Sequence, residues 1–457
     1  MSYDYLVIGG GASGMTSALL LAKNGYRVAL VEKHPCPGPL LSSFDRQGLR
    51  FDTGFHYSGD LDRGQLLDRF FRYLGLSPLI QTSAYDAAGF DVFRSLRPAF
   101  EFRFPMGYEA LRERLTATFP AEADAIATYL RVIAEIKATT DDFILETGKT
   151  KPYLREYDEV SLKDFLDGLT DNTLLQALLC CHGLLYGVAP EQVPLALHAR
   201  VVGSYYRSVH GIVGGGESLV AAVLTCRGCN ATVHPRTLLQ LVPEGLFRPV
   251  YRRRLAGLKE SASGVILYAA SDRPIALLDR ANLYLAEDPT AFFSPQEGTW
   301  QQRPLFVSAA RKLARERQAQ GFFSIGLTPA ELSGDMLFAG DDGGAESYGQ
   351  AKERVARLLR TRLERLCPEL RERVVGHELS TSRTLKRYSH SPAGSLYGVA
   401  QRVGQKNPLP LTRIPGLFLA GQAINGPGLL GVMISAFQAC AHAIGSEQLK
   451  KDLMRCN

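Results

Sequence analysis

The first 35 residues divide into three short stretches with different spacing of their apolar positions. Residues 5–8 form a fully apolar run with β-branched residues at its end, which predicts a strand buried on both faces. Residues 15–24 follow helical spacing, and Gly25 ends the predicted helix. Residues 27–32 form a second apolar run, which ends in an acidic residue. The pattern predicts a strand–helix–strand unit and therefore an α/β fold.

The middle of the chain alternates between helical and strand-like stretches. Apolar residues recur every three to four positions in five stretches, which predicts helices over residues 66–74, 109–118, 124–139, 174–185 and 353–365. Shorter runs with few polar residues predict strands over residues 265–270, 283–286, 305–308 and 322–327. We expect these strands to form a sheet beneath the helices, in a second unit of α+β type.

The last fifty residues show a strand-like run before a glycine-rich turn. Residues 416–422 predict a strand entering that turn, and a helix is expected to follow to about residue 444. Residues 426–431 also match Gly-x-Gly-x-x-Gly, which could suggest a second dinucleotide site for NAD(P)H. We discount that site, because the chain ends too soon for another β–α–β unit. We expect the helix N-terminus to face a cofactor instead.

Composition and charge exclude several classes of protein. With 457 residues, 46% hydrophobic and 21% charged, the chain is neither disordered nor fibrous. Eight irregularly spaced cysteines predict reduced thiols and a cytoplasmic location. No unbroken run of 18 apolar residues occurs, so we expect no membrane-spanning helix. The net charge of +6 is spread over short arginine patches, which argues against nucleic acid as a partner.

Cys226, Cys229 and His234 suggest a metal site or a redox dithiol. A structural zinc site needs four ligands, and a redox dithiol would open a helix in a thioredoxin-like unit. Neither requirement is met, so no metal site is expected.

A glycine-rich loop, Gly9-x-Gly11-x-x-Gly14, joins the first predicted strand to the first helix. Its first glycine permits a tight turn, its second lets the backbone approach a pyrophosphate, and its third permits close helix–strand packing. The helix N-terminus offers N–H groups to the phosphates, and Glu32 can accept a hydrogen bond from a ribose hydroxyl. The motif predicts a dinucleotide site. A second glycine-bearing loop at Gly38 favours FAD over NAD.

Four features carry a family resemblance. The first is the loop at residues 9–14 together with Glu32, and the second is Gly38. The third is the run Phe-Asp-Thr-Gly-Phe-His-Tyr at residues 51–57, and the fourth is the stretch of residues 421–433. Together they resemble the phytoene desaturase, carotenoid isomerase and retinol saturase family of FAD-dependent oxidoreductases, within the amine-oxidase-like superfamily. The run at residues 51–57 is most similar to the retinol saturase branch. The resemblance covers both ends of the chain well and the middle more loosely.

The resemblance implies FAD as cofactor and a discontinuous, Rossmann-like FAD-binding domain beside an α+β substrate domain, whose mixed sheet is covered by helices. The FAD-binding domain would comprise residues 1–80, 212–262 and 385–457, and the substrate domain residues 81–211 and 263–384. The implied activity is saturation, desaturation or isomerisation of a hydrophobic conjugated polyene, carotenoid- or retinoid-like. Two alternatives stay open: an amine oxidase acting on a small amine, and a non-catalytic protein that binds a polyene or FAD.

The same resemblance assigns candidate site residues. The expected FAD-binding residues are Gly9, Gly11, Ala12, Ser13, Gly14, Glu32, Lys33, Gly38, Gly421, Gln422, Gly431, Val432 and Met433. The candidate catalytic residues are His56 and Tyr57, because reduction of a polyene by hydride needs an acid that protonates the second carbon.

The chain departs from the family pattern at two places. Pro39 follows Gly38 where relatives usually have a second glycine, and proline removes one N–H donor. Residues 225–235 pass directly from a helix to a turn, where the family has strands that complete the FAD-domain sheet. Either that sheet has lost strands or another segment replaces them.

Two arginine-rich stretches, residues 252–254 and 311–317, are expected to be solvated helix faces. Since polyenes dissolve in bilayers, peripheral contact with an anionic membrane is the alternative role for either stretch.

Overall fold

The computed structural model describes residues 2–46, 49–143, 152–224, 234–242, 245–279, 281–310, 321–330, 347–371 and 373–456. Two expectations lie outside these residues. One is the Cys226–Cys229 pair, and the other is the basic stretch at residues 311–317. In the described part of the chain, no group of three or more His, Cys, Asp or Glu residues could hold a metal ion.

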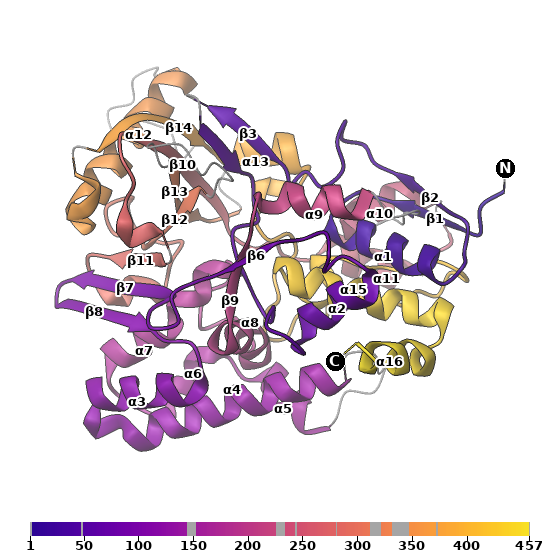
Figure 1. Cartoon of the computed structure of the whole chain (residues 1–457), viewed down its shortest axis with the longest axis horizontal. Helices are drawn as coiled ribbons and strands as arrows, with labels where there is room; N and C mark the ends of the chain where they lie inside the picture. The colour runs from indigo at the N-terminus through magenta and orange to yellow at the C-terminus, as the bar shows by residue number, and fades with distance from the viewer. Residues whose placement is uncertain are drawn as a thin grey trace.

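The largest element is a seven-stranded mixed sheet of order β14-β10-β13-β12-β11-β7-β8 (Figure 1). Its only parallel pair among the described strands is β11 with β7, and the other neighbours are antiparallel. In chain order the strands are β7 (Asp91–Leu96), β8 (Ala99–Phe104), β10 (Ser263–Ser271), β11 (Asn282–Ala286), β12 (Leu305–Ala310), β13 (Gly321–Thr328) and β14 (Val374–Ser380).

Strand alternation divides the buried residues of this sheet between two cores. One face, with Tyr284, Phe306 and Phe323, packs in the core that also contains the helices of residues 108–207. The other face, with Leu283 and Val307, packs against α12 (Tyr348–Leu366). The helices of the first face are α3 (Tyr108–Thr118), α4 (Ala123–Phe143), α5 (Pro152–Glu159), α6 (Leu162–Asp167), α7 (Thr173–Cys180) and α8 (Leu195–Arg207).

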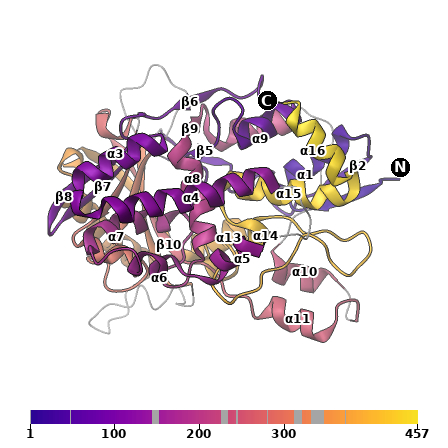
Figure 2. The ribbon, with the colours of Figure 1, turned by 90° about the horizontal axis from the view of Figure 1, so that it is seen from below.

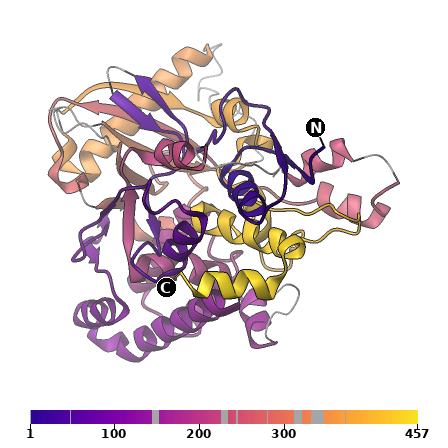
Figure 3. The same ribbon diagram turned by 45° about the vertical axis from the view of Figure 1, so that its right-hand side comes forward.

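The second unit contains β1 (Tyr5–Ile8), α1 (Ala12–Lys23) and β2 (Val28–Val31), with β1 and β2 paired in parallel. The N-terminal α1 packs along the C-terminal α15 (Gly428–Ile444), and Figures 1 and 3 show these two helices side by side. Around them lie α2 (Leu66–Leu74), α9 (Gly215–Leu224), α14 (Gln422–Asn425) and α16 (Ser446–Met454). The α/β fold with a mixed sheet expected from the sequence is therefore confirmed.

Short strands connect the two units. The hairpin β3 (Ser43–Arg46) and β4 (Leu49–Asp52) leads into β5 (Ser58–Gly59). In a small sheet, β5 and β6 (Thr82–Ala84) both pair with β9 (Val209–Ile212). Because β5 also packs on α15, the chain leaving residues 51–57 lies against the C-terminal helix.

The strand–helix–strand unit differs from its sequence prediction in one respect. Leu6 of β1 is 61% exposed and Val31 of β2 is 52% exposed, so these strands are not buried on both faces. The expected strand at residues 416–422 is also wrong, because this segment makes only an isolated bridge between Phe418 and Leu411. The described part of the chain thus holds a two-stranded sheet here, and each of its strands has one strongly exposed apolar side chain.

Helices, not strands, are described on the far side of residues 225–233. After residues 225–233, the chain forms α10 (Pro235–Leu241) and α11 (Pro249–Ala256), and α13 (Ser382–Ser389) follows the large sheet. Figure 2 shows α10 and α11 projecting from the body together with a loop that precedes α14. In the described ranges, no further strand joins the sheet of β1 and β2. Among the described helices, none has the length and apolar character needed to cross a bilayer.

Candidate active site

The loop between β1 and α1 has the geometry expected for contact with phosphates. Gly9 has a φ of 105°, which permits the tight turn, and Gly11 is the N-cap of α1 without a side-chain hydrogen bond. A Cβ placed on Gly11 would meet no atom within 4 Å, so the backbone faces open space. Ser13 and Gly14 are buried in the first turn of α1. The N–H groups of this turn therefore fit a pyrophosphate.

Glu32 follows β2 and holds this loop in place. Its carboxylate accepts hydrogen bonds from the backbone N–H of Gly10 and, at 2.7 Å, from that of His34. Gly38 returns to the same point, where its N–H donates to the Gly10 carbonyl oxygen at 2.7 Å. Lys33 is exposed beside them. The acid, the glycine-rich loop and the second loop thus meet at one place.

The C-terminal glycine-rich turn lies against this N-terminal loop. The Ser435 hydroxyl of α15 is 3.4 Å from the Ser13 hydroxyl of α1, although 422 residues separate them in sequence. Ser435 also accepts a hydrogen bond from the Gly421 N–H at 2.7 Å and donates to the Val432 carbonyl oxygen at 2.8 Å. One serine therefore ties the turn at residues 421–432 to the first turn of α1.

Two glycines, one in the C-terminal turn and one packed against it, are needed for close approach. A Cβ on Gly431 would lie 2.6 Å from the Gly426 carbonyl oxygen, and a Cβ on Gly398 would lie 2.5 Å from the Gln422 side-chain nitrogen. Met433 is buried beneath the turn, and Val432 is half-buried. The expected FAD-binding residues from both ends of the chain are thus brought together in one region.

The two candidate catalytic residues have different environments. The half-buried imidazole of His56 stacks on the Phe323 ring, with 3.9 Å between ring centroids. Tyr57 is buried, and its hydroxyl lies 2.8 Å from the Tyr284 hydroxyl. Burial raises the pKa of Tyr57 well above its ordinary value, so this hydroxyl stays protonated at neutral pH.

Aromatic rings continue from these residues into the core between the large sheet and its helices. The Tyr57 ring lies 4.9 Å from the Tyr205 ring and 5.6 Å from the Tyr85 ring. The nearby buried carboxylate of Asp91 binds His182 at 3.0 Å and Asn282 at 2.8 Å. These rings are packed in a buried core, and the buried acid beside them is already engaged.

The chain is similar in sequence to known oxidoreductases. Residues 7–74 match the family model of an NAD(P)-binding Rossmann-like domain. Human all-trans-retinol 13,14-reductase is 25% identical, over 98% of this chain and 87% of its own length. Methylomonas 4,4'-diapolycopene oxygenase is 23% identical, over 94% of this chain and 96% of its own. The chain is a homologue of the retinol reductases and carotenoid-converting oxidoreductases.

A further relative is the 4,4'-diapophytoene desaturase of Staphylococcus haemolyticus, 25% identical over 48% of this chain and 45% of its own. The expected resemblance to phytoene desaturases and retinol saturases is therefore confirmed. The alignment with the human reductase extends over 549 positions, more than the 457 residues of this chain. The human reductase therefore contains residues within the aligned region that have no counterpart in this chain.

Solved structures of amine oxidases share the fold. Putrescine oxidase bound to putrescine superposes with a TM-score of 0.64 at 14% identity, covering 97% of this chain and 99% of its own. Cyclohexylamine oxidase from Brevibacterium oxydans gives 0.62 at 14% identity, covering 98% and 100%. At this identity the likeness concerns the fold alone.

Sequence reasoning missed Ser435 and Gly10. Ser435 is one of the few polar residues in an otherwise apolar helix, and that isolation was the available signal. Gly10 occupies the variable position between the first two glycines of the Gly-x-Gly-x-x-Gly motif. A Cβ at Gly10 would lie 3.0 Å from the Glu32 carboxylate, so a glycine suits this position.

Proposed function

We propose that the chain binds one FAD between its two ends and uses it on a hydrophobic conjugated polyene. The observation that carries this proposal is the contact between Ser13 and Ser435, which joins the two glycine-rich turns in one site. We also propose two domains. The FAD-binding domain would comprise residues 1–80, 212–262 and 385–457, and the substrate domain would comprise residues 81–211 and 263–384. Homology to retinol and carotenoid oxidoreductases over nearly the whole chain supports the substrate class.

Each part of the site would have one task. Gly9, Gly11 and the first turn of α1 would hold the pyrophosphate, and Glu32 would accept from the adenosine ribose. The N-terminus of α15, next to Val432 and Met433, would face the flavin ring and favour negative charge on it. When bound, FAD supplies hydride transfer to or from a carbon atom.

His56 would exchange the accompanying proton with the neighbouring carbon of the polyene. It is the better of the two candidates, because its imidazole is only half-buried, whereas Tyr57 is buried. The aromatic rings around Tyr57 would orient the polyene, which supplies much of the rate enhancement in such a reaction. Saturation, desaturation and isomerisation would each use these same groups.

Oxidation of a small amine fits the site less well. A cationic amine would need an aromatic cage together with an available carboxylate near the flavin. Asp91, the buried acid among these rings, is already hydrogen-bonded to His182 and Asn282. The likeness to amine oxidases concerns the fold alone.

The proposed location is cytoplasmic, at the surface of a membrane. The described cysteines are all free thiols, which suits a reducing compartment. Peripheral membrane contact would bring the chain to polyenes, which dissolve in bilayers.

The test is a His56→Phe variant, which keeps an aromatic ring against Phe323 but removes the imidazole. We expect the purified protein to take up FAD and to convert retinol or a C30 carotenoid. In the variant, FAD content should be unchanged and turnover should fall at least 100-fold, as for loss of a general acid. A matched change on the large sheet, His377→Phe, should leave turnover unchanged.

Two results would contradict the proposal. Unchanged turnover in His56→Phe would remove this residue from the mechanism. A purified protein that stays colourless after incubation with FAD would favour a non-catalytic polyene-binding protein instead.

A further inference from the structure

One end of the molecule projects away from both units. It consists of α10, residues 245–259 with α11, and residues 398–420, and we call these segments the basic end. Figures 2 and 3 both show α10, α11 and the loop before α14 extending from the body in the same direction. A small core that includes Phe247, Leu258 and Leu419 holds the segments together.

The basic end concentrates positive charge. Its two longer segments, residues 245–259 and 398–420, contain eight basic residues and no Asp or Glu. The whole chain has a formal charge of only +6, so the rest of the chain is slightly acidic. The eight residues are Arg248, Arg252, Arg253, Arg254, Lys259, Arg402, Lys406 and Arg413. Such an asymmetry favours an anionic partner at this end.

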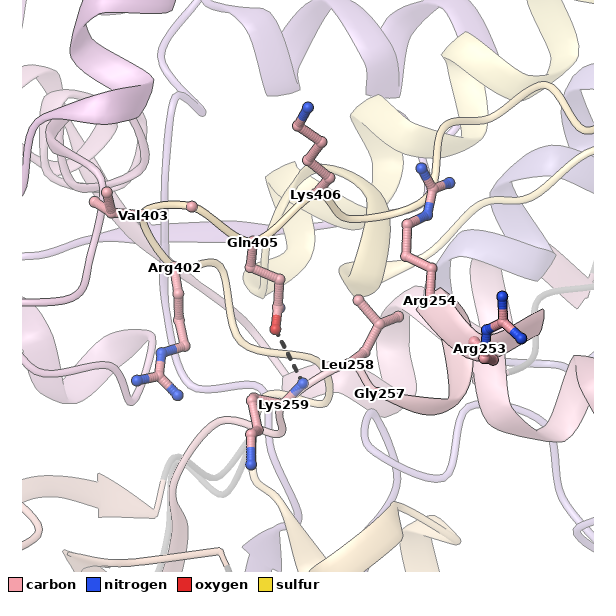
Figure 4. Close-up of a pocket in the computed structure, with 10 residues that line it drawn as sticks. Arg253, Arg254, Gly257, Leu258, Lys259, Arg402, Val403, Gln405 and Lys406 are labelled. Atoms are coloured by element: carbon pink, nitrogen blue, oxygen red, sulfur yellow. Dashed lines mark hydrogen bonds between the residues drawn. The ribbon is translucent and has the colours of Figure 1, made fainter. Parts of the chain in front are cut away.

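Five of these side chains line one open pocket of about 480 Å³ between α11 and the loop at residues 402–406. The pocket-lining basic residues are Arg253, Arg254, Lys259, Arg402 and Lys406, and no acidic residue lines the pocket (Figure 4). The Gln405 side-chain oxygen accepts from the Lys259 N–H at 3.0 Å and fixes the loop against α11. No carboxylate in the described ranges pairs with Arg253, Arg254 or Lys406. The pocket is therefore suited to phosphate groups.

The basic end also carries exposed apolar side chains. Five of them in the basic end are 51–69% exposed: Leu241, Leu246, Val250, Leu409 and Leu411. Val250 lies on the same face of α11 as Arg253 and Arg254, at the i, i+3 and i+4 spacing of a helix. Single exposed apolar residues are ordinary, but several of them among cations at one projecting end indicate an interaction surface.

We propose that the basic end docks on the anionic surface of a lipid bilayer. The exposed apolar side chains would enter the boundary between headgroups and acyl chains, and the pocket would bind lipid phosphates. A free anion in solution would use the charges but leave these apolar side chains in water. This inference deepens the proposed function and rests on it, since a polyene would be delivered from that bilayer.

The position of the basic end relative to the candidate site suits this role. Gly398 packs against Gln422 of the C-terminal turn, and the Gln401 side chain donates to the Ala423 carbonyl oxygen at 3.4 Å. Residues 398–406 thus run directly from the proposed FAD site to the cationic pocket. A bilayer bound at this end would lie next to the half of the site that would hold the flavin ring.

The experiment is flotation of the full-length protein with vesicles that contain no polyene. We expect binding to vesicles of phosphatidylcholine with 30% phosphatidylserine, loss of binding in 0.5 M NaCl, and little binding to pure phosphatidylcholine. A triple variant, Arg253→Glu, Arg254→Glu and Lys406→Glu, should bind the anionic vesicles at least tenfold more weakly. The pair Leu409→Ser and Leu411→Ser should also reduce binding severalfold.

Matched controls separate docking from overall charge and from folding. The triple variant Lys23→Glu, Arg63→Glu and Lys451→Glu makes the same charge change at exposed residues on α1, α16 and the loop before α2, and it should keep vesicle binding. Val375→Ser, at a 67% exposed position on the large sheet, should keep it too. All variants should retain the melting temperature of the wild-type protein.

Three outcomes would overturn the proposal: no flotation of the wild type, equal losses in the two triple variants, or inorganic phosphate bound in the pocket without any vesicle binding. The flotation assay needs no turnover. Failure of polyene conversion in detergent, with vesicle binding intact, would therefore contradict the proposed function and leave the docking surface supported.

Discussion

At the scale of single residues, a substitution of Gly11 should weaken cofactor binding without affecting folding. Its φ of −68° suits any amino acid, and a Cβ at this position would meet no atom within 4 Å. Gly11→Val should therefore fold with the stability of the wild type, while its side chain fills the space proposed for the pyrophosphate. We expect at least a 100-fold loss of FAD affinity, measured by quenching of flavin fluorescence.

Gly349→Ala is the matched control, since Gly349 also has open space but lies on α12, outside the proposed site. FAD bound equally well by Gly11→Val and Gly349→Ala would place the pyrophosphate elsewhere.

His198 makes a second residue-scale prediction, about pH. Burial lowers its pKa to about 3, and its two ring nitrogens meet the Tyr129 and Tyr186 hydroxyls at 2.9 and 3.0 Å. The unfolded chain binds a proton at this histidine near pH 6.5, and the folded chain does not. The free energy of unfolding is therefore unaffected by His198 above pH 6.5 and decreases as the pH falls towards 3. At pH 5 the loss from this residue is about 2 kcal/mol.

His198→Gln stays neutral over this range. Urea unfolding at pH 7 and pH 5 should therefore show a smaller difference in the variant than in the wild type, by about 2 kcal/mol. Equal differences in the two proteins would show that His198 is protonated in the folded state.

Residues with local signals were predictable, and residues defined by distant contacts were not. Glu32 could be identified because it ends a strand at a fixed spacing after a glycine-rich loop. The isolation of Ser435 in an apolar helix marks the residue but not its role, because its partners Ser13 and Gly421 are brought to it by the packing of α1 on α15.

At the scale of elements, a buried cluster of charges joins α4, α8 and the end of β5. Lys137 of α4 lies 2.7 Å from Asp60, and Arg207 of α8 lies 2.6 Å from Asp60 and 2.7 Å from Asp141. A Cβ on Gly203 would lie 2.9 Å from the Lys137 side chain, so a glycine is needed for this close approach of the two helices. The cluster fixes the chain directly after His56 and Tyr57.

Lys137→Met should destabilise the protein by about 3–5 kcal/mol, because it leaves two buried carboxylates opposite one arginine. Arg131→Met on the same helix removes an exposed ion pair with Glu135 and should cost less than about 1 kcal/mol. Chemical denaturation of both variants checks the difference. Similar midpoints in the two would mean that the cluster adds nothing to stability.

Elements with a strong periodic pattern were predicted nearly to their ends. The prediction over residues 265–270 lies within β10, and the helix expected over residues 174–185 begins with α7 but continues from Cys181 as a 3-10 helix. The strand expected at residues 416–422 fails for a non-local reason. A run of apolar residues becomes a strand only beside a partner strand, and the described residues offer it only a bridge to Leu411.

At the scale of the whole molecule, the fold class followed from the alternation of patterns, but the order of strands did not. The large sheet pairs β7 with β11, nearly 200 residues further along the chain, and no local signal encodes that contact. The same limit applies to the basic end. Its arginines are visible in the sequence, but their meeting with Lys406 and the exposed leucines required the tertiary structure.

The central claim is that both ends of the chain hold one cofactor. Hydrogen–deuterium exchange of the full-length protein, with increasing FAD, tests it most directly. We predict that backbone amides of residues 9–16 and residues 421–433 gain protection together, with the same half-saturating FAD concentration. Protection confined to one of these two segments, or reached at different FAD concentrations, would contradict it.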